Sequence, residues 1–433
     1  MKEVKKYPTR AIQSWAKMKE LRTDHFWHTW KAHDKGELVV MGQPTLDAVL
    51  AGFGNVATPA YDPNFNRVLR SVDKVLEQQE IVDAQGYGSE LCHAMRMQLG
   101  AMFEGTNIRS PEGKVVKPDF IFQWHNCSPL AKCAQIAGEH MGVPFFLVDS
   151  PPSNTPGWKK SFVGQLQEFI EWAEKLTGRK YDDEKLIEAT KNEWETMVTF
   201  ARTCELTQTI PTPLDGRHTQ SLRMPTVAIR CRKECVEYTH MLLDEVRERV
   251  KDGISARGFE GMRINRGIGT QFNQRLNRFP EMYGAIVIPG PVGAFSAWST
   301  REDGSWYVPQ TPMERGIQLR TREDALNAEA DLWQGGGWAV ARALAILLNH
   351  VPKIVVQEAK QWRLDAMIWP IHRSTEAACQ AAPMEARLAL LAAGIPVWAY
   401  ETTMCDPRFY DESRAREQVS TFFESLGMKK IFD

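Results

Sequence analysis

The feature that most constrains the fold is a strand, helix and strand between residues 117 and 152. The apolar run Phe120–Gln123 is followed by a helical segment at Ser128–Met141 and a second apolar run at Phe145–Asp149. Gly142-Val143-Pro144 turns the chain between the helix and the second run. Two strands joined by a crossover helix lie parallel in one sheet, because a tight hairpin joins only antiparallel strands. The stretch therefore predicts an α/β fold.

A similar order of elements recurs near the C-terminus. The strand Ala366–Trp369 leads to His372, a helix across Ala377–Ala393, a Gly-Ile-Pro turn and the strand Val397–Tyr400. Both stretches have the order aspartate, strand, histidine, helix, Gly-β-branched-Pro, strand. We interpret them as a weak internal repeat and expect two Rossmann-like lobes with parallel sheets.

The rest of the chain divides around these two units. Residues 1–34 repeat apolar side chains at helical spacing, which predicts an N-terminal helical arm. Residues 35–155 would form the first α/β lobe, and residues 156–255, rich in helix formers, a helical connecting segment. Residues 256–433 would form the second lobe, with the apolar run Ala285–Pro289 as a central strand.

Charge and apolar patterning argue against two classes of partner. The 53 basic and 54 acidic side chains give a net charge of -1, so no overall field favours nucleic acid. The longest apolar stretches are broken by Pro and Gly and fall short of the roughly 20 residues of a membrane span. The start of the chain has no apolar signal core. We expect a cytoplasmic protein that binds neither nucleic acid nor membrane, with its eight cysteines outside any disulfide framework.

Cys127 is the strongest candidate for chemistry. It follows one predicted strand and precedes a predicted helix, which places it at the carboxyl edge of the sheet, where α/β proteins usually bind ligands. The N–H groups and dipole of the helix favour a thiolate there. Packing as a small buried hydrophobe is the alternative, and it is the preferred interpretation for Cys133, inside the same helix.

Cys92 is the second candidate. In Ser89-Glu-Leu-Cys-His-Ala-Met-Arg96, Ser89 would cap a helix, and Cys92 would lie in its first turn on the same face as Arg96. The arginine charge also favours a thiolate, so a ligand role and a packing role are equally open. Cys405, in a Thr-Thr-Met-Cys-Asp-Pro turn, is expected to be exposed.

Two histidines end strands at the same predicted sheet edge. His125 and His372 could each donate a proton to a substrate bound there, although a capping or core role is the alternative for either. The sequence contains no GxGxxG, HExxH or GxSxG pattern and no P-loop.

Four stretches of the chain resemble the 2-hydroxyacyl-CoA dehydratase and benzoyl-CoA reductase family. Within that family the chain is most similar to the larger of the two cluster-bearing subunits of ATP-dependent, class I benzoyl-CoA reductases. The stretches cover both predicted lobes and read SELCHAMRMQLG, HNCSPLAKCAQIAGEHMGVPFFLVDSPP, GMRINRGIGTQFNQRLNRFPEMYGAIVIP and AAGIPVWAYETTMCDPRFYDESRAREQVSTFFESLG.

The resemblance implies a [4Fe-4S] cluster held by three cysteines from separated regions. Cys92 and Cys127 match the first two. The third is expected where this chain has Thr375, and Cys379, one helical turn further on, is the nearest replacement. Three thiolates would leave one iron open to substrate, and such a site needs no CxxC pair.

The resemblance also implies a reaction and partners. The reaction is ATP-dependent reduction of benzoyl-CoA to a cyclohexadiene-carbonyl-CoA in anaerobic aromatic degradation, with His125 as the candidate proton donor. The partners would be a smaller homologous cluster-bearing subunit, an ATP-hydrolysing activator pair and ferredoxin as the upstream donor. Two alternatives are a subunit of a 2-hydroxyacyl-CoA dehydratase and a cluster-free scaffold subunit, the latter suggested by the missing cysteine at Thr375.

Overall fold

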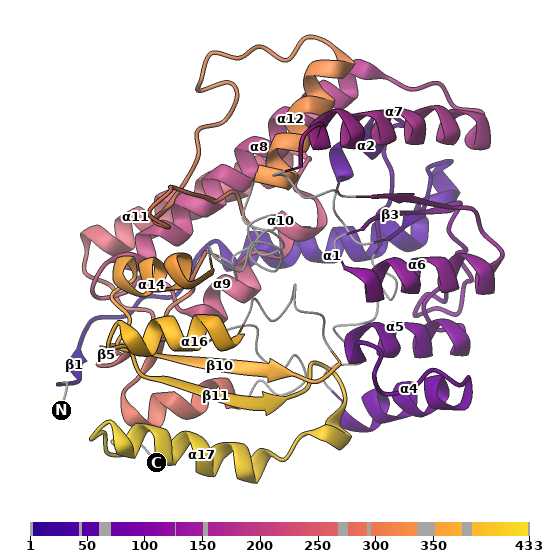
Figure 1. Cartoon of the computed structure of the whole chain (residues 1–433). Coiled ribbons are helices and arrows are strands. Elements are labelled where there is room, and N and C mark those ends of the chain that lie inside the picture. The colour runs from indigo at the N-terminus through magenta and orange to yellow at the C-terminus, as the bar shows by residue number, and fades with distance from the viewer. Residues whose placement is uncertain are drawn as a thin grey trace.

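The chain has a mixed α/β fold with two parallel sheets surrounded by helices (Figure 1). This computed structural model describes residues 3–42, 46–59, 71–125, 127–149, 155–266, 276–291, 296–335, 351–374 and 383–431. The predicted α/β class is confirmed, whereas the two-lobe Rossmann-like arrangement and the four predicted domains stay predictions. Across the described part of the chain, no helix combines the length and apolarity needed to cross a membrane.

The first sheet contains the crossover unit predicted from the sequence. Its strand order is β2-β3-β4, and both pairings are parallel. The side chains of β3 alternate between two cores: Phe120 and Phe122 pack against α7 and α8, and Ile121 packs against α5 and α6. The elements are β2 (Val40–Met41), β3 (Phe120–Trp124), α6 (Ser128–Met141), β4 (Phe145–Val148), α7 (Trp158–Thr177) and α8 (Asp183–Glu205).

The second sheet has the strand order β11-β10-β6-β7, again all parallel. Helices α14 and α16 pack on one face, and α17 packs on the other. The second strand-helix-strand unit is thereby confirmed in its strands, although part of its helix lies outside the described residues. The elements are β6 (Arg263–Arg266), β7 (Ile286–Val287), α14 (Val351–Gln361), β10 (Ala366–His372), α16 (Pro383–Ala392), β11 (Val397–Thr402) and α17 (Glu412–Ser425).

The prediction that Ala285–Pro289 is a central strand is wrong, because β7 is the end strand and β6 and β10 are central. β6 begins with Arg263, which is 1% exposed. Its guanidinium forms an ion pair with Glu260 and donates to the Trp362 carbonyl, so the charge is satisfied inside the protein. An arginine in a short polar sequence suggests an exposed segment, which hid this strand.

The remaining helices include the predicted N-terminal helical arm and connecting helices. α1 packs against α10 and α11, and the short strands β1 and β5 pair antiparallel. These elements are α1 (Trp15–Lys31), α2 (Asp47–Ala51), α4 (Val72–Ala84), α5 (His93–Glu104), α9 (Gly216–Leu222), α10 (Met224–Ala228), α11 (Lys233–Lys251), α12 (Arg322–Gly335), β1 (Lys5–Lys6), β5 (Phe259–Glu260), β8 (Ser299–Thr300) and β9 (Trp306–Tyr307).

The carboxyl end of the second sheet meets the helices that flank the first. Figure 1 shows the arrowheads of β10 and β11 pointing toward α5. The turn after β11 continues into the 3-10 helix η5 (Pro407–Phe409), which packs on α4. The residues that follow both strands are therefore brought against the start of α5, where Cys92 lies.

Candidate metal centre

Cys127 lies where the sequence predicted. It is the N-cap residue of α6, in extended conformation, directly after the carboxyl end of β3, and it is half-buried. Pro129 occupies the first turn of the helix, where its missing N–H costs nothing. The sulfur is thus positioned next to backbone N–H groups and the positive end of the helix dipole, which favour the thiolate form.

Cys92 is the N-cap residue of α5 rather than a residue of its first turn, so the predicted placement was one position off. It is 8% exposed and belongs to a buried apolar cluster. Arg96 does not occupy a solvent-facing position beside it. The guanidinium of Arg96 is fully buried and pairs with Asp83 of α4. The setting shared with Cys127 is therefore the helix N-terminus.

Cys133 connects the two candidates in space. Burial raises the pKa of its thiol, and the neighbouring thiols of Cys92 and Cys127 raise that pKa further. Cys133 is 2% exposed and packs in the core between α6 and the first sheet, as predicted. Because both other thiols act on it, Cys92 and Cys127 flank one common region of the protein.

The prediction that Cys405 is exposed is wrong, because the residue is completely buried. It packs in the same apolar cluster as Cys92, which also contains Val75, Ala94 and Met97. Burial raises the pKa of its thiol, and Cys92 adds to the shift. The polar turn sequence gave no sign of this burial, which depends on the turn folding onto α4 and α5. The usable signal was its position after a strand at the predicted ligand edge.

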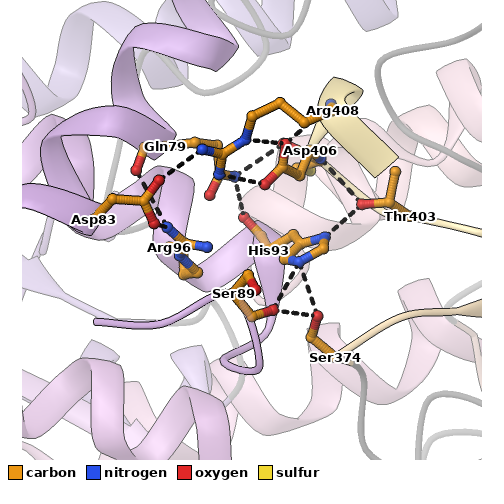
Figure 2. Close-up of polar contacts among 10 residues, drawn as sticks. Gln79, Asp83, Ser89, His93, Arg96, Ser374, Thr403, Asp406 and Arg408 are labelled. Carbon is orange, nitrogen blue, oxygen red and sulfur yellow. Dashed lines mark hydrogen bonds and ion pairs between the residues drawn. The ribbon is translucent and has the colours of Figure 1, made fainter. Parts of the chain in front are cut away.

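Hydrogen bonds tie the start of α5 to the second sheet (Figure 2). His93 Nδ1 lies 2.5 Å from Thr403 Oγ1, and its Nε2 lies 2.8 Å from Ser374 Oγ. Ser374 Oγ also donates to the Ser89 carbonyl. Burial lowers the pKa of His93, which favours a neutral ring. His93 was not anticipated as a contact between the sheets.

The other predicted ligand, Cys379, lies outside the described residues, as does Thr375. Ser374, directly before Thr375, is described and touches the segment that carries Cys92. His372 ends β10 and is 2% exposed, which agrees with the core alternative for that histidine.

His125 lies at the carboxyl end of β3, as predicted, and pairs with an aspartate that was not foreseen. Its Nδ1 is 2.8 Å from Asp149 Oδ1, at the end of the neighbouring strand β4. Gln165 accepts from the Asp149 backbone N–H at 2.7 Å and donates to its carbonyl at 3.1 Å. A carboxylate on Nδ1 fixes the tautomer of an imidazole and leaves Nε2 to carry a proton.

The donor set suits an iron-sulfur cluster better than a single ion. Thiolates are the usual ligands of such clusters, and helix N-termini offset their negative charge. Among the residues that the structure describes, no three His, Cys, Asp or Glu side chains are gathered closely enough to hold one metal ion. A cluster has an inorganic core between its ligands, so its cysteines stand further apart.

A separate group of buried charges lies among α2, α8 and α12. Arg230 Nε is 3.2 Å from Glu193 Oε1, and Arg230 Nη2 is 3.5 Å from Asp47 Oδ2. The guanidinium also lies over the Trp333 ring. Burial raises the pKa of Asp47 to about 6 and that of Glu329 to about 7. One arginine thus faces three buried carboxyl groups that hold protons near neutral pH.

Parallel α/β folds with thiols at helix N-termini at the sheet edge belong to the class of proteins that bind ligands at this edge. Residues 49–291 match the family model described as 2-hydroxyglutaryl-CoA dehydratase, D-component. This span is more than half of the chain and contains Cys92 and Cys127. The chain therefore belongs to this family, which confirms the resemblance found in its sequence.

Individual relatives are distant. The chain is 28% identical over 191 residues to the (R)-phenyllactyl-CoA dehydratase alpha subunit of Clostridium sporogenes, covering 43% of this chain and 46% of the relative. For the (R)-2-hydroxyisocaproyl-CoA dehydratase alpha subunit of Clostridioides difficile the values are 24% over 254 residues, 57% and 61%. For a benzoyl-CoA reductase subunit of Thauera aromatica they are 21% over 366 residues, 81% and 80%. The match thus spans only about half to three fifths of the two dehydratase subunits.

Proposed function

We propose that this chain is the iron-sulfur subunit of an ATP-dependent reductase that dearomatises benzoyl-CoA to a cyclohexadiene-carbonyl-CoA. One observation carries the choice of reaction. The similarity to the Thauera aromatica reductase subunit extends over 81% of this chain and 80% of that protein, whereas the two dehydratase matches cover 43% and 57% of this chain. A likeness along most of both chains supports a common overall organisation.

In this proposal Cys92 and Cys127 hold a [4Fe-4S] cluster with a third cysteine. A bound cluster would supply one-electron transfer and, at an iron without a protein ligand, a position open to substrate. The chain itself supplies the thiolates, which the N-termini of α5 and α6 stabilise. The close-packed apolar side chains around Cys92 exclude water from its surroundings.

Ring reduction consumes protons as well as electrons, and His125 is the proposed proton donor. Its Nδ1 is held by Asp149, which in turn is fixed by Gln165, so the ring is oriented by two layers of hydrogen bonds. The imidazole lies two residues before Cys127 at the same sheet edge. A proton held at Nε2 would be delivered next to the site of electron transfer.

The proposed partners follow from the division of labour in such a system. A smaller homologous cluster-bearing subunit would complete the reductase, and an ATP-hydrolysing activator pair fed by ferredoxin would deliver electrons. The relatives are themselves subunits, alpha subunits in the dehydratases, which supports a protein with more than one kind of chain. The lack of a P-loop in this sequence is consistent with ATP hydrolysis on another chain.

A 2-hydroxyacyl-CoA dehydratase subunit is the second candidate. The observation in its favour is the higher sequence identity, 28% against 21%, over the segment shared with the phenyllactyl-CoA dehydratase subunit. In that reaction the electron is recycled rather than consumed, so the two candidates differ in how much reductant they use.

An anaerobic assay of the complete complex, purified with its partner subunits, separates the candidates. We expect benzoyl-CoA to be reduced with ATP hydrolysis and with reductant consumed in proportion to product. Loss of water from a 2-hydroxyacyl-CoA with only catalytic reductant would instead establish the dehydratase. A colourless, iron-free chain under strict anoxia would refute both and support the cluster-free scaffold.

A further inference from the structure

We propose that Cys405, rather than Cys379, supplies the third protein thiolate of the cluster begun by Cys92 and Cys127. The inference rests on the proposed function, because it presupposes a cluster. It is carried by the way in which the structure fastens the turn that bears Cys405 to the helix start that bears Cys92.

A single buried amide joins the two cysteine-bearing segments. Gln79 Nε2 donates to the carbonyl of His93, which follows Cys92, and to the carbonyl of Cys405, each at 2.9 Å. Gln79 is fully buried on α4. One side chain therefore fixes the backbone at Cys405 relative to the backbone beside Cys92, although they lie more than 300 residues apart in sequence.

Further contacts hold the same turn from its two ends. Thr403 Oγ1 contacts His93 Nδ1 and accepts from the Asp406 backbone N–H at 3.1 Å. Arg408 then bridges Asp406 and Asp83, with nitrogen-oxygen distances of 2.7 and 2.6 Å. Figure 2 shows this network running from α4 through α5 to the turn. The position of Cys405 is thus determined by residues on both sides of it.

The thiols themselves meet in one apolar cluster. Cys92 and Cys405 pack together with Val75, Ala94 and Met97, and Cys405 is completely buried. Cys92 is in turn close enough to Cys133 to affect its titration, as is Cys127. A series of sulfurs therefore runs from the turn after β11, past the start of α5, to the start of α6.

This placement answers the loss of the expected ligand. In the family pattern the third cysteine follows β10, where this chain has Thr375. Ser374, just before that position, touches Ser89 and the ring of His93. Cys405 follows the adjacent parallel strand β11 and reaches the same helix start. A thiol has been lost after one strand and is present after its neighbour, on the same border of Cys92.

The opposing interpretation is that Cys405 is only a small buried hydrophobe. Iron and sulfide content distinguishes the two, with no need for an activity. The full chain and the variants Cys405→Ala, Cys379→Ala and Cys133→Ala are purified under strict anoxia and reconstituted with ferrous iron and sulfide. Cys133→Ala is the matched control, because it removes another buried thiol from the same neighbourhood.

We expect Cys405→Ala to lose most of its iron, sulfide and visible absorption, while Cys379→Ala and Cys133→Ala keep wild-type content. Retention of full iron content by Cys405→Ala overturns the inference, whether or not Cys379→Ala loses its iron. An iron-free wild-type chain refutes the proposed function itself, a result distinct from selective loss in one variant.

A folding defect in the alanine variant is covered by Cys405→Ser, which keeps the size of the side chain and offers an oxygen ligand. Circular dichroism reports whether each variant is folded. If Cys405 is a ligand, the serine variant shows either loss of the cluster or a changed electron paramagnetic resonance spectrum. A folded serine variant with the full iron content and the unchanged spectrum of the wild type overturns the inference.

Discussion

Glu358 gives the sharpest test of the energetics, because its carboxyl group is buried in the second sheet with one amide partner. Asn265 Nδ2 donates to Glu358 Oε1 at 2.6 Å, and the residue is 6% exposed. Burial raises the pKa of this carboxyl to about 8, against an ordinary value of 4.5. The side chain is therefore neutral in the folded protein at physiological pH.

The sign of the pH dependence follows from proton binding. Between pH 4.5 and pH 8 the folded protein holds a proton that the unfolded chain has released, so the stability falls as pH rises through this window. Each pH unit inside the window costs up to about 1.4 kcal/mol. From pH 5 to pH 8 the loss for a fully buried carboxyl is therefore roughly 3 to 4 kcal/mol.

Glu358→Gln removes the titration while keeping the shape and the oxygen that accepts from Asn265. We expect the variant to gain on the wild type as pH rises, reaching roughly 3 kcal/mol or more at pH 8. Urea unfolding at pH 5.5, 7 and 8.5 measures the difference, and Glu237→Gln, at an exposed position, serves as the control with changes of about 0.5 kcal/mol or less. A difference between wild type and Glu358→Gln that stays constant with pH would refute the reasoning.

Three further predictions use the same protein preparations. Arg230→Leu leaves three buried carboxyl groups without their cation, so urea unfolding at pH 8 should show a loss of about 3–5 kcal/mol that shrinks at pH 6, where these groups take up protons; a loss that does not vary with pH would contradict this. Asp149→Asn frees the imidazole of His125 and should lower the turnover of the complete complex about a hundredfold with iron content unchanged; unaltered turnover would remove His125 from the mechanism. Gln79→Ala removes two buried hydrogen bonds between the segments that carry Cys92 and Cys405 and should cost about 2 kcal/mol in thermal or urea unfolding, and a neutral effect would show that this amide does not join them energetically.

The parts of the fold that the sequence predicted are those set by local patterns. β3, α6 and β4 were found because an apolar run, a capped helix with proline in its first turn and a Gly-Val-Pro turn each signal their structure within a few residues. β6 was missed because Arg263 is buried by partners distant in sequence, including the carbonyls of Thr207 and Trp362.

The candidate site divides in the same way. Cys127 and His125 could be placed because both follow a recognisable strand. Cys405 could not, because its burial comes from contacts of one turn with α4 and α5, and nothing in its immediate neighbours records them. The pairing of His125 with Asp149 also depends on the register of β3 and β4, which local sequence does not specify.

The complete burial of Cys405 beneath the turn that carries it has a kinetic consequence. A thiol reagent can reach this sulfur only when the turn lifts away from α5, which requires the contacts made by Gln79 and His93 to break. At high reagent concentration the labelling rate should therefore level off at the opening rate of that contact. Cys405 is thus a built-in reporter of how often the two sheets part.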